Sequence, residues 1–191
     1  MPRRASAATA VLALLLLGSL GASSAATAGP LARRATALKC STLVNPGHVG
    51  SAIGVAVKRP LSSTIDNVFN PNSRSTGSEC QWYPVAPTSV FLTGEFAVQL
   101  TVQAGVTASQ LHKLVSGEIK SAASPVYRGT VTRPAGLGAN AAVAVLAPEQ
   151  AGEGPKTVVY ALRGRDAFFV YSAEAPTANV VAVAKAVFAK I

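Results

Sequence analysis

The chain has 191 residues, enough for one domain with a sizeable hydrophobic core. It carries 17 Lys and Arg against 8 Asp and Glu, a formal net charge of +9, and is 49% hydrophobic. No apolar run reaches the ~18–20 residues of a membrane-spanning helix, and the cations are scattered. These features argue against stable membrane insertion and against a nucleic-acid-binding tract.

Residues 1–28 have the three parts of a secretory signal peptide: a charged start, a short apolar run and a small-residue cleavage site. An uncleaved membrane anchor is the alternative to cleavage. The three parts are Arg3 with Arg4, Val11–Leu17, and Ala26-Thr27-Ala28.

Cleavage at this site leaves a chain with 15 basic and 8 acidic residues, a net charge of +7. Residues 29–39 are expected to be a mobile lead-in, and residues 40–191 a single domain. Thiols oxidise outside the cytoplasm, so we expect Cys40 and Cys80 to form a disulfide. A redox pair or a metal site is the alternative. However, redox cysteines usually lie close in sequence, and a metal needs more ligands than two histidines add.

Between the cysteines, the sequence predicts a helix, a short strand and a long loop. Pro46 can begin the helix and Gly54 can end it. Val55–Val57 is typical of a strand. Pro60–Glu79 is rich in Ser, Asn, Pro and Thr, and is expected to be a loop, either functional or mobile.

Two strands follow. The first begins at Cys80 and places Trp82 on the same face, so the tryptophan is expected beside the disulfide. The second, Phe96–Gln103, alternates apolar and polar residues. Its core-facing residues are expected to be Phe96, Val98, Leu100 and Val102, and its outward-facing ones Gln99, Thr101 and Gln103.

A longer helix comes next. Thr107 and Gln110 have the spacing of a capping box, and Pro125 is expected to end the helix. Its buried stripe is predicted to be Leu111, Leu114, Val115, Ile119 and Ala122.

The C-terminal part repeats this order of strands and a helix. Ala142–Leu146 is a predicted strand, and Thr157–Leu162 with Ala167–Ala173 forms a predicted hairpin. The hairpin's second strand is apolar on both faces and is therefore expected to be central. We thus expect an α+β fold: an antiparallel sheet of five to six strands, covered by two longer helices and one short helix. The last helix starts near Thr177 and buries Val180, Val183, Ala184, Val187 and Ile191.

Groups for catalysis are sparse. Nothing in the spacing of His48 or His112 brings either near a serine, and the carboxylates are dispersed. Gly136–Ala141 imitates the dinucleotide fingerprint, but a predicted strand follows it where a helix is required. We expect no catalytic, cofactor or metal site.

Four arginines form a candidate anion-binding patch. Arg163 and Arg165 flank the glycine of the predicted hairpin, and Arg128 and Arg133 extend the patch if they share its rim. The ligand would be an anionic wall polymer. The alternative is a hairpin charged to block association through the sheet edge.

The order of several motifs resembles a family of actinobacterial exported proteins and lipoproteins of unknown function. That resemblance implies an α+β fold and supplies no ligand or reaction. Members of this family are often lipid-anchored, and this chain departs from that pattern because no cysteine directly follows its leader. The motifs are Cys40, the helix Val49–Gly54, Cys80-Gln81-Trp82, the strand Val98–Val102, Gly136-Leu137-Gly138 with Ala141, the hairpin and the final helix.

We expect a non-enzymatic module that binds a ligand or a partner and is secreted or lies in the cell envelope. We expect no nucleic-acid partner. A sheet face or Pro60–Glu79 would be its contact surface. A sensor or accessory protein for an envelope partner is the alternative, and an unrecognised hydrolase is the least favoured hypothesis. The larger aromatic residues either line a pocket or fill the core: Trp82, Tyr83, Phe91, Phe168, Phe169 and Tyr171.

Overall fold

The computed structural model describes residues 38–69, 75–91, 94–122, 129–147 and 154–191. The predicted signal peptide, most of the lead-in, Pro125 and Arg128 lie outside these residues. The elements are α1 (Cys40–Leu43), α2 (Pro46–Ile53), β1 (Leu61–Asp66), β2 (Thr76–Trp82), β3 (Val98–Ala104), α3 (Ala108–Ala122), β4 (Thr130–Thr132), β5 (Ala142–Leu146), β6 (Lys156–Arg163), β7 (Asp166–Ser172) and α4 (Thr177–Phe188).

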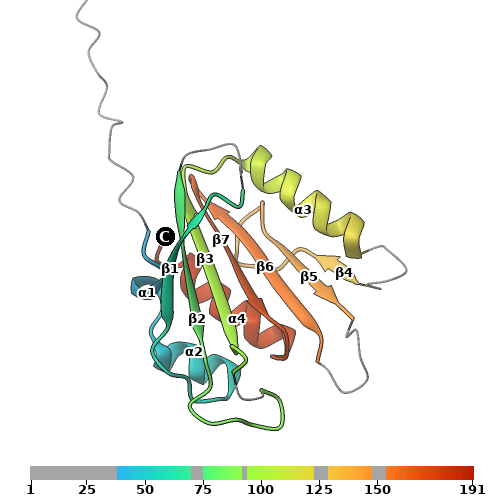
Figure 1. Ribbon diagram of the computed structural model, residues 1–191. Helices are drawn as coiled ribbons and strands as arrows, with labels where there is room; N and C mark the ends of the chain where they lie inside the picture. Colours follow the sequence, from blue (N-terminus) through green and yellow to red (C-terminus); the bar gives the residue numbers. More distant parts are fainter. Residues whose placement is uncertain (1–37, 70–74, 92–93, 123–128, 148–153) are drawn as a thin grey trace, which may run out of the picture. The chain divides into compact units, whose positions relative to one another are not determined.

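The described residues form an α+β fold with one antiparallel sheet in the order β1-β2-β3-β7-β6-β5-β4 (Figure 1). The sheet has seven strands, so the expected count of five to six was too low. Three elements were not predicted from the sequence: the two edge strands, β1 and β4, and the one-turn helix α1. The predicted central position of β7 is confirmed, because β3 and β6 pair with its two edges.

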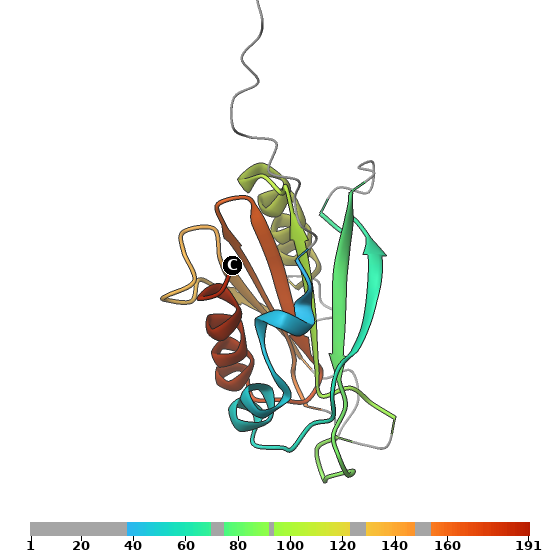
Figure 2. The same ribbon diagram turned by 90° about the vertical axis from the view of Figure 1, so that its left-hand side faces the viewer.

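Helices lie on both faces of the sheet (Figures 1 and 2). We call the face that carries Leu100 and Phe168 the α4 face, because α4 packs on it over β6 and β7. The opposite face, which carries Thr101 and Phe169, is the α3 face. There α3 covers β4, β5 and β6. The strands β1, β2 and β3 on that side are not under α3.

The α4 face holds the main core. Trp82, Leu100 and Phe168 are fully buried there. The predicted stripe of α4 is confirmed except for its last member, since Ile191 lies beyond the helix and is half-buried. The buried stripe consists of Val180, Val183, Ala184 and Val187.

The predicted hairpin between β6 and β7 is confirmed. Arg163 pairs with Asp166, so two residues make the turn. Gly164 has φ +63°, a left-handed conformation that glycine adopts without steric cost.

The disulfide between Cys40 and Cys80 is also confirmed, with 5.8 Å between the two Cα atoms. It joins α1 to β2, and both residues are fully buried in the main core together with Trp82. Such a bond fits an oxidising, extracytoplasmic compartment.

The predicted loop Pro60–Glu79 was wrong, because its two ends form β1 and the first half of β2, paired from Leu61–Gln81 to Asp66–Thr76. Residues 70–74 lie outside the described part. As an edge strand, β1 is mostly exposed and its sequence is largely polar. The alternation of apolar and polar residues that predicts a strand is therefore missing. Val55–Val57 is likewise no strand, since only Val57 makes an isolated bridge, to Pro84.

The predicted alternation of β3 was wrong on its polar side. Thr101 and Gln103 are fully buried on the α3 face, although both were expected to face out. Phe69, which follows β1, packs against Phe169 on this face. Gln103 donates a hydrogen bond from Nε2 to Ser75 Oγ at 3.3 Å. Phe96 was also misplaced: it is half-buried and contacts Tyr171 on the α3 face.

Candidate functional site

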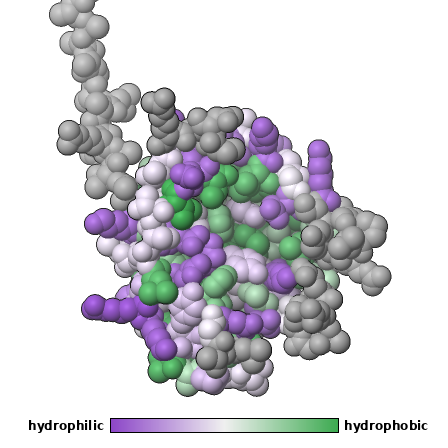
Figure 3. Space-filling model, in the orientation of Figure 1, coloured by the Kyte–Doolittle hydropathy of each residue, from purple (hydrophilic) through white to green (hydrophobic). Residues whose placement is uncertain are grey.

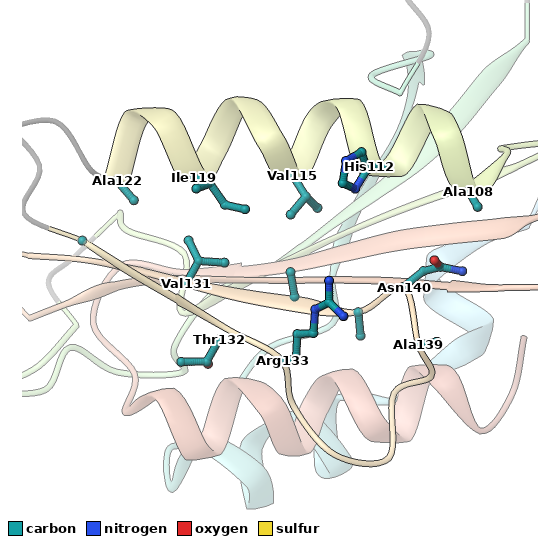
Figure 4. A pocket seen from close by; sticks show the side chains of 13 residues that line it. Ala108, His112, Val115, Ile119, Ala122, Val131, Thr132, Arg133, Ala139 and Asn140 are labelled. Atoms are coloured by element: carbon teal, nitrogen blue, oxygen red, sulfur yellow. The ribbon is translucent and has the colours of Figure 1, made fainter.

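A groove of about 350 Å³ lies between α3 and the edge strands β4 and β5 (Figure 4). Apolar side chains from both sides form its walls. Three polar side chains, His112, Arg133 and Asn140, lie toward one end, and Thr132 lies nearer the other. Its lining residues are Ala108, His112, Val115, Ile119, Ala122, Gly129, Val131, Thr132, Arg133, Ala139, Asn140, Ala141 and Ala142.

The first turn of α3 is fixed firmly, as the predicted capping box is confirmed. Gln110 N donates to Thr107 Oγ1 at 3.2 Å, and Thr107 N donates to Gln110 Oε1 at 2.8 Å. One turn later, Leu111 is buried in a small core against Tyr160 and Leu162. The N-terminal half of α3 is therefore anchored on β6.

Tyr160 provides a second anchor. Burial raises the pKa of its hydroxyl, and the negative charge and hydrogen bond of Glu118 raise this pKa further. The Tyr160 hydroxyl is the donor of this hydrogen bond and the Glu118 carboxylate is its acceptor. This bond ties the middle of α3 to the sheet and directs a carboxylate of α3 at Tyr160.

The C-terminal half of α3 lies beside β4, the short strand at the edge of the sheet. Because β4 has just three residues, it offers little surface to the helix. Ile119 was predicted to be in the buried stripe of α3, and that prediction was wrong: its side chain is 46% exposed. It faces Val131 across the groove (Figure 4). The space between them is therefore open to a ligand.

The polar end of the groove carries a positive charge. Arg133 leaves the end of β4 and points its guanidinium toward α3, on the side where His112 and Asn140 lie (Figure 4). All three side chains are exposed. The lining contains no Asp or Glu, so the local potential favours an anion at this end.

Arg163 and Arg165 lie at the hairpin between β6 and β7, whereas Arg133 lies after β4. Arg163 donates to the carbonyl oxygen of Phe188 at 2.9 Å and lies 5.6 Å from the centre of its ring. Arg165 donates to the carbonyl oxygen of Gly105 at 3.3 Å. Arg133 lines the groove. A shared wall-polymer site therefore stays a prediction.

The remaining candidates lie elsewhere. His48 is exposed in the first turn of α2, where its backbone N–H donates to Asn45. Among the aromatic residues, Trp82, Phe91 and Phe168 fill the core rather than a pocket. Burial also raises the pKa of Asp166 at the hairpin turn.

Sequence reasoning missed the groove for two reasons. Its apolar wall on α3 has the periodicity of a core-facing stripe, and periodicity cannot show whether a strand lies opposite. Arg133 and Asn140 flank the Gly136–Gly138 turn, and no local pattern predicts that this turn brings both residues to one groove.

Ile119 and Leu111 provide a test of the groove as an open site. Leu111→Ala is expected to lower the free energy of unfolding by about 2–5 kcal/mol, because Leu111 is buried. Ile119→Ala should lower it by less than about 1 kcal/mol, since nearly half of its side chain is exposed. Urea unfolding of both variants measures this difference. Equal losses would show that the groove is closed in solution.

Within the described residues, no group of three or more His, Cys, Asp or Glu side chains is placed to hold a metal ion. In the same part of the chain, no helix is both long enough and apolar enough to cross a membrane. No protein-family model matches the sequence, and no curated protein matches it significantly.

Proposed function

We propose that this protein is an exported, non-enzymatic binding module that holds a small amphipathic anion in the groove beside α3. The observation that carries the proposal is the exposed position of Ile119 opposite Val131, with Arg133 at the end of the same groove. Leaving an apolar side chain exposed costs free energy of folding. Such departures from the packing rules are typical of functional sites.

The lining defines the ligand chemistry. Ligand pockets are mostly apolar, with few polar groups that fix orientation, and about 350 Å³ falls at the lower end of their usual range. The apolar walls suit a short hydrocarbon or ring system. Arg133 suits a carboxylate or phosphate head group, because guanidinium pairs with both through two parallel N–H donors.

Export is supported by two features. Residues 1–28 have the pattern of a cleaved signal peptide. The disulfide between Cys40 and Cys80 fits an oxidising space. The proposed place of action is the cell envelope or the medium, in keeping with the resemblance to actinobacterial exported proteins. An accessory role, in which the bound ligand alters contact with an envelope protein, is the alternative.

The test is isothermal titration calorimetry of the processed protein with octanoate and with octan-1-ol. Arg133→Gln should weaken octanoate binding about tenfold, the effect of one charge-assisted hydrogen bond. Binding of octan-1-ol should change by less than about twofold, because the alcohol carries no charge for Arg133 to pair with.

Arg59→Gln is the matched control. Arg59 is exposed and lies outside the groove, so this variant loses the same charge without touching the site. Octanoate affinity should stay at the wild-type value. The proposal is wrong if octanoate does not bind, or if both variants weaken its binding equally.

A further inference from the structure

A second surface lies on the part of the α3 face that α3 leaves uncovered. Register places Leu61, Gln81, Gln99 and Tyr171 side by side on four neighbouring strands, β1, β2, β3 and β7. Adjacent strands lie about 4.8 Å apart, so this row is about 14 Å long. Leu61 is 65% exposed, and the other three are half-buried. This row is therefore a surface that solvent reaches.

Hydrogen bonds fix the amide groups of this surface. Gln81 donates from Nε2 to one oxygen of Glu79 at 3.1 Å, and Gln99 donates from Nε2 to the other oxygen at 2.8 Å. Tyr83 donates its hydroxyl to Gln81 Oε1 at 2.8 Å. Each amide in this chain of bonds is held by its neighbour, so its orientation on the surface is fixed.

Aromatic rings border these amides. The Phe96 ring centre lies 6.4 Å from that of Tyr83 and 5.8 Å from that of Tyr171. All three side chains are half-buried, so each ring presents part of its surface to solvent. Figure 3 views the molecule from this side, and hydrophobic and hydrophilic side chains are mixed across it.

We propose that this surface, which we call the amide–aromatic ledge, binds a neutral oligosaccharide. The ledge comprises Glu79, Gln81, Tyr83, Phe96, Gln99 and Tyr171.

A sugar ring matches the ledge in both of its chemistries. Its hydroxyl groups both donate and accept hydrogen bonds, as amide side chains do. Its C–H faces pack on aromatic rings, whose faces carry partial negative charge. A pre-oriented array of amides beside partly exposed rings offers both contacts at once, with little side-chain entropy left to lose.

The charge at the centre of the ledge favours a neutral sugar over an anionic one. Lys58 and Arg59 lie outside the ledge, where they line a hollow with Leu61 and Tyr83. Glu79 is the sole ionisable carboxylate of the ledge, and none of its six residues is Lys or Arg. An anionic polymer would meet a negative charge at the centre of the surface. The ledge shares no residue with the groove beside α3. Binding at the ledge is therefore independent of binding in the groove.

The test is biolayer interferometry on four immobilised neutral polysaccharides: dextran, mannan, galactan and arabinan. The protein should bind at least one of them. Its affinity should change by less than about twofold between 0.1 and 0.5 M NaCl, because salt screens charge–charge contacts and leaves these contacts intact. Gln99→Leu and Phe96→Ala should each weaken binding at least about fivefold.

Two controls keep the result interpretable. Arg133→Gln, in the groove, should bind the polysaccharide as the wild type does. Gln99→Leu should keep the wild-type thermal unfolding midpoint within a few degrees, which excludes misfolding as the cause of weaker binding. The proposal fails if none of the four polysaccharides binds, if Gln99→Leu binds normally, or if anionic polygalacturonate binds more tightly than all four.

Discussion

Replacing Cys40 and Cys80 together with alanine is expected to lower the free energy of unfolding by about 4 kcal/mol. The bond closes a loop across 40 positions, and the loss is the entropy that the unfolded chain regains when this loop opens. For a domain of this size the thermal midpoint should fall by about 8–16 °C. Guanidinium unfolding followed by far-UV circular dichroism measures the change.

Reduction provides the matching measurement on the wild type. The protein treated with dithiothreitol should unfold at the same denaturant concentration as the double variant. Ser78→Ala is a local control, because Ser78 Oγ lies 3.1 Å from Cys40 Sγ and its loss leaves the cross-link intact. Equal stability of the oxidised and reduced forms would refute a stabilising role for the bond.

Trp82→Ala is expected to lower the free energy of unfolding by about 3–5 kcal/mol. Trp82 is fully buried and heads the set of large core side chains. Within the described residues its indole Nε1 has no hydrogen-bond partner. Trp82→Phe removes that buried donor while keeping an aromatic ring, so its loss should be less than half that of Trp82→Ala.

Tyr83→Ala is the neighbouring control, since Tyr83 is half-buried on the opposite face of the sheet. Urea unfolding of both variants should show a smaller loss in the free energy of unfolding for Tyr83→Ala than for Trp82→Ala. If Trp82→Phe costs as much as Trp82→Ala, the indole N–H has a partner that stabilises the fold, and our view of this part of the core is wrong.

Much of the fold could be predicted because its signals are local. The hairpin between β6 and β7 has a two-residue turn with glycine at its first position. The capping box at Thr107 marks the start of α3, and the spacing of valines and alanines marks the buried side of α4. Each of these patterns needs no knowledge of the rest of the chain.

The missed elements depend on distant partners. β1 is polar and exposed, and it becomes a strand because β2 offers it a partner edge. The alternation of β3 predicts that Thr101 and Gln103 face outward, but both are buried, on the face where Phe69 packs and Ser75 bonds to Gln103. A polar alternation pattern predicts exposure correctly only where nothing covers that face.

The candidate site was missed for the same reason. The stripe on α3 was predicted correctly as apolar, and Leu111 is buried as expected. Ile119 lies two turns further along, opposite the short edge strand β4, which covers it only in part. Its exposure follows from where the sheet ends, which no pattern within the helix reveals.

The most direct measurement of the groove is a titration of ¹⁵N-labelled protein with octanoate, followed by two-dimensional amide spectra. We predict saturable shifts that are largest for amides of α3 from His112 onward, for β4, and for the turn between Arg133 and Ala142. Shifts that fail to saturate, or that centre on the hairpin at Arg163 and Arg165, would contradict a ligand site beside α3.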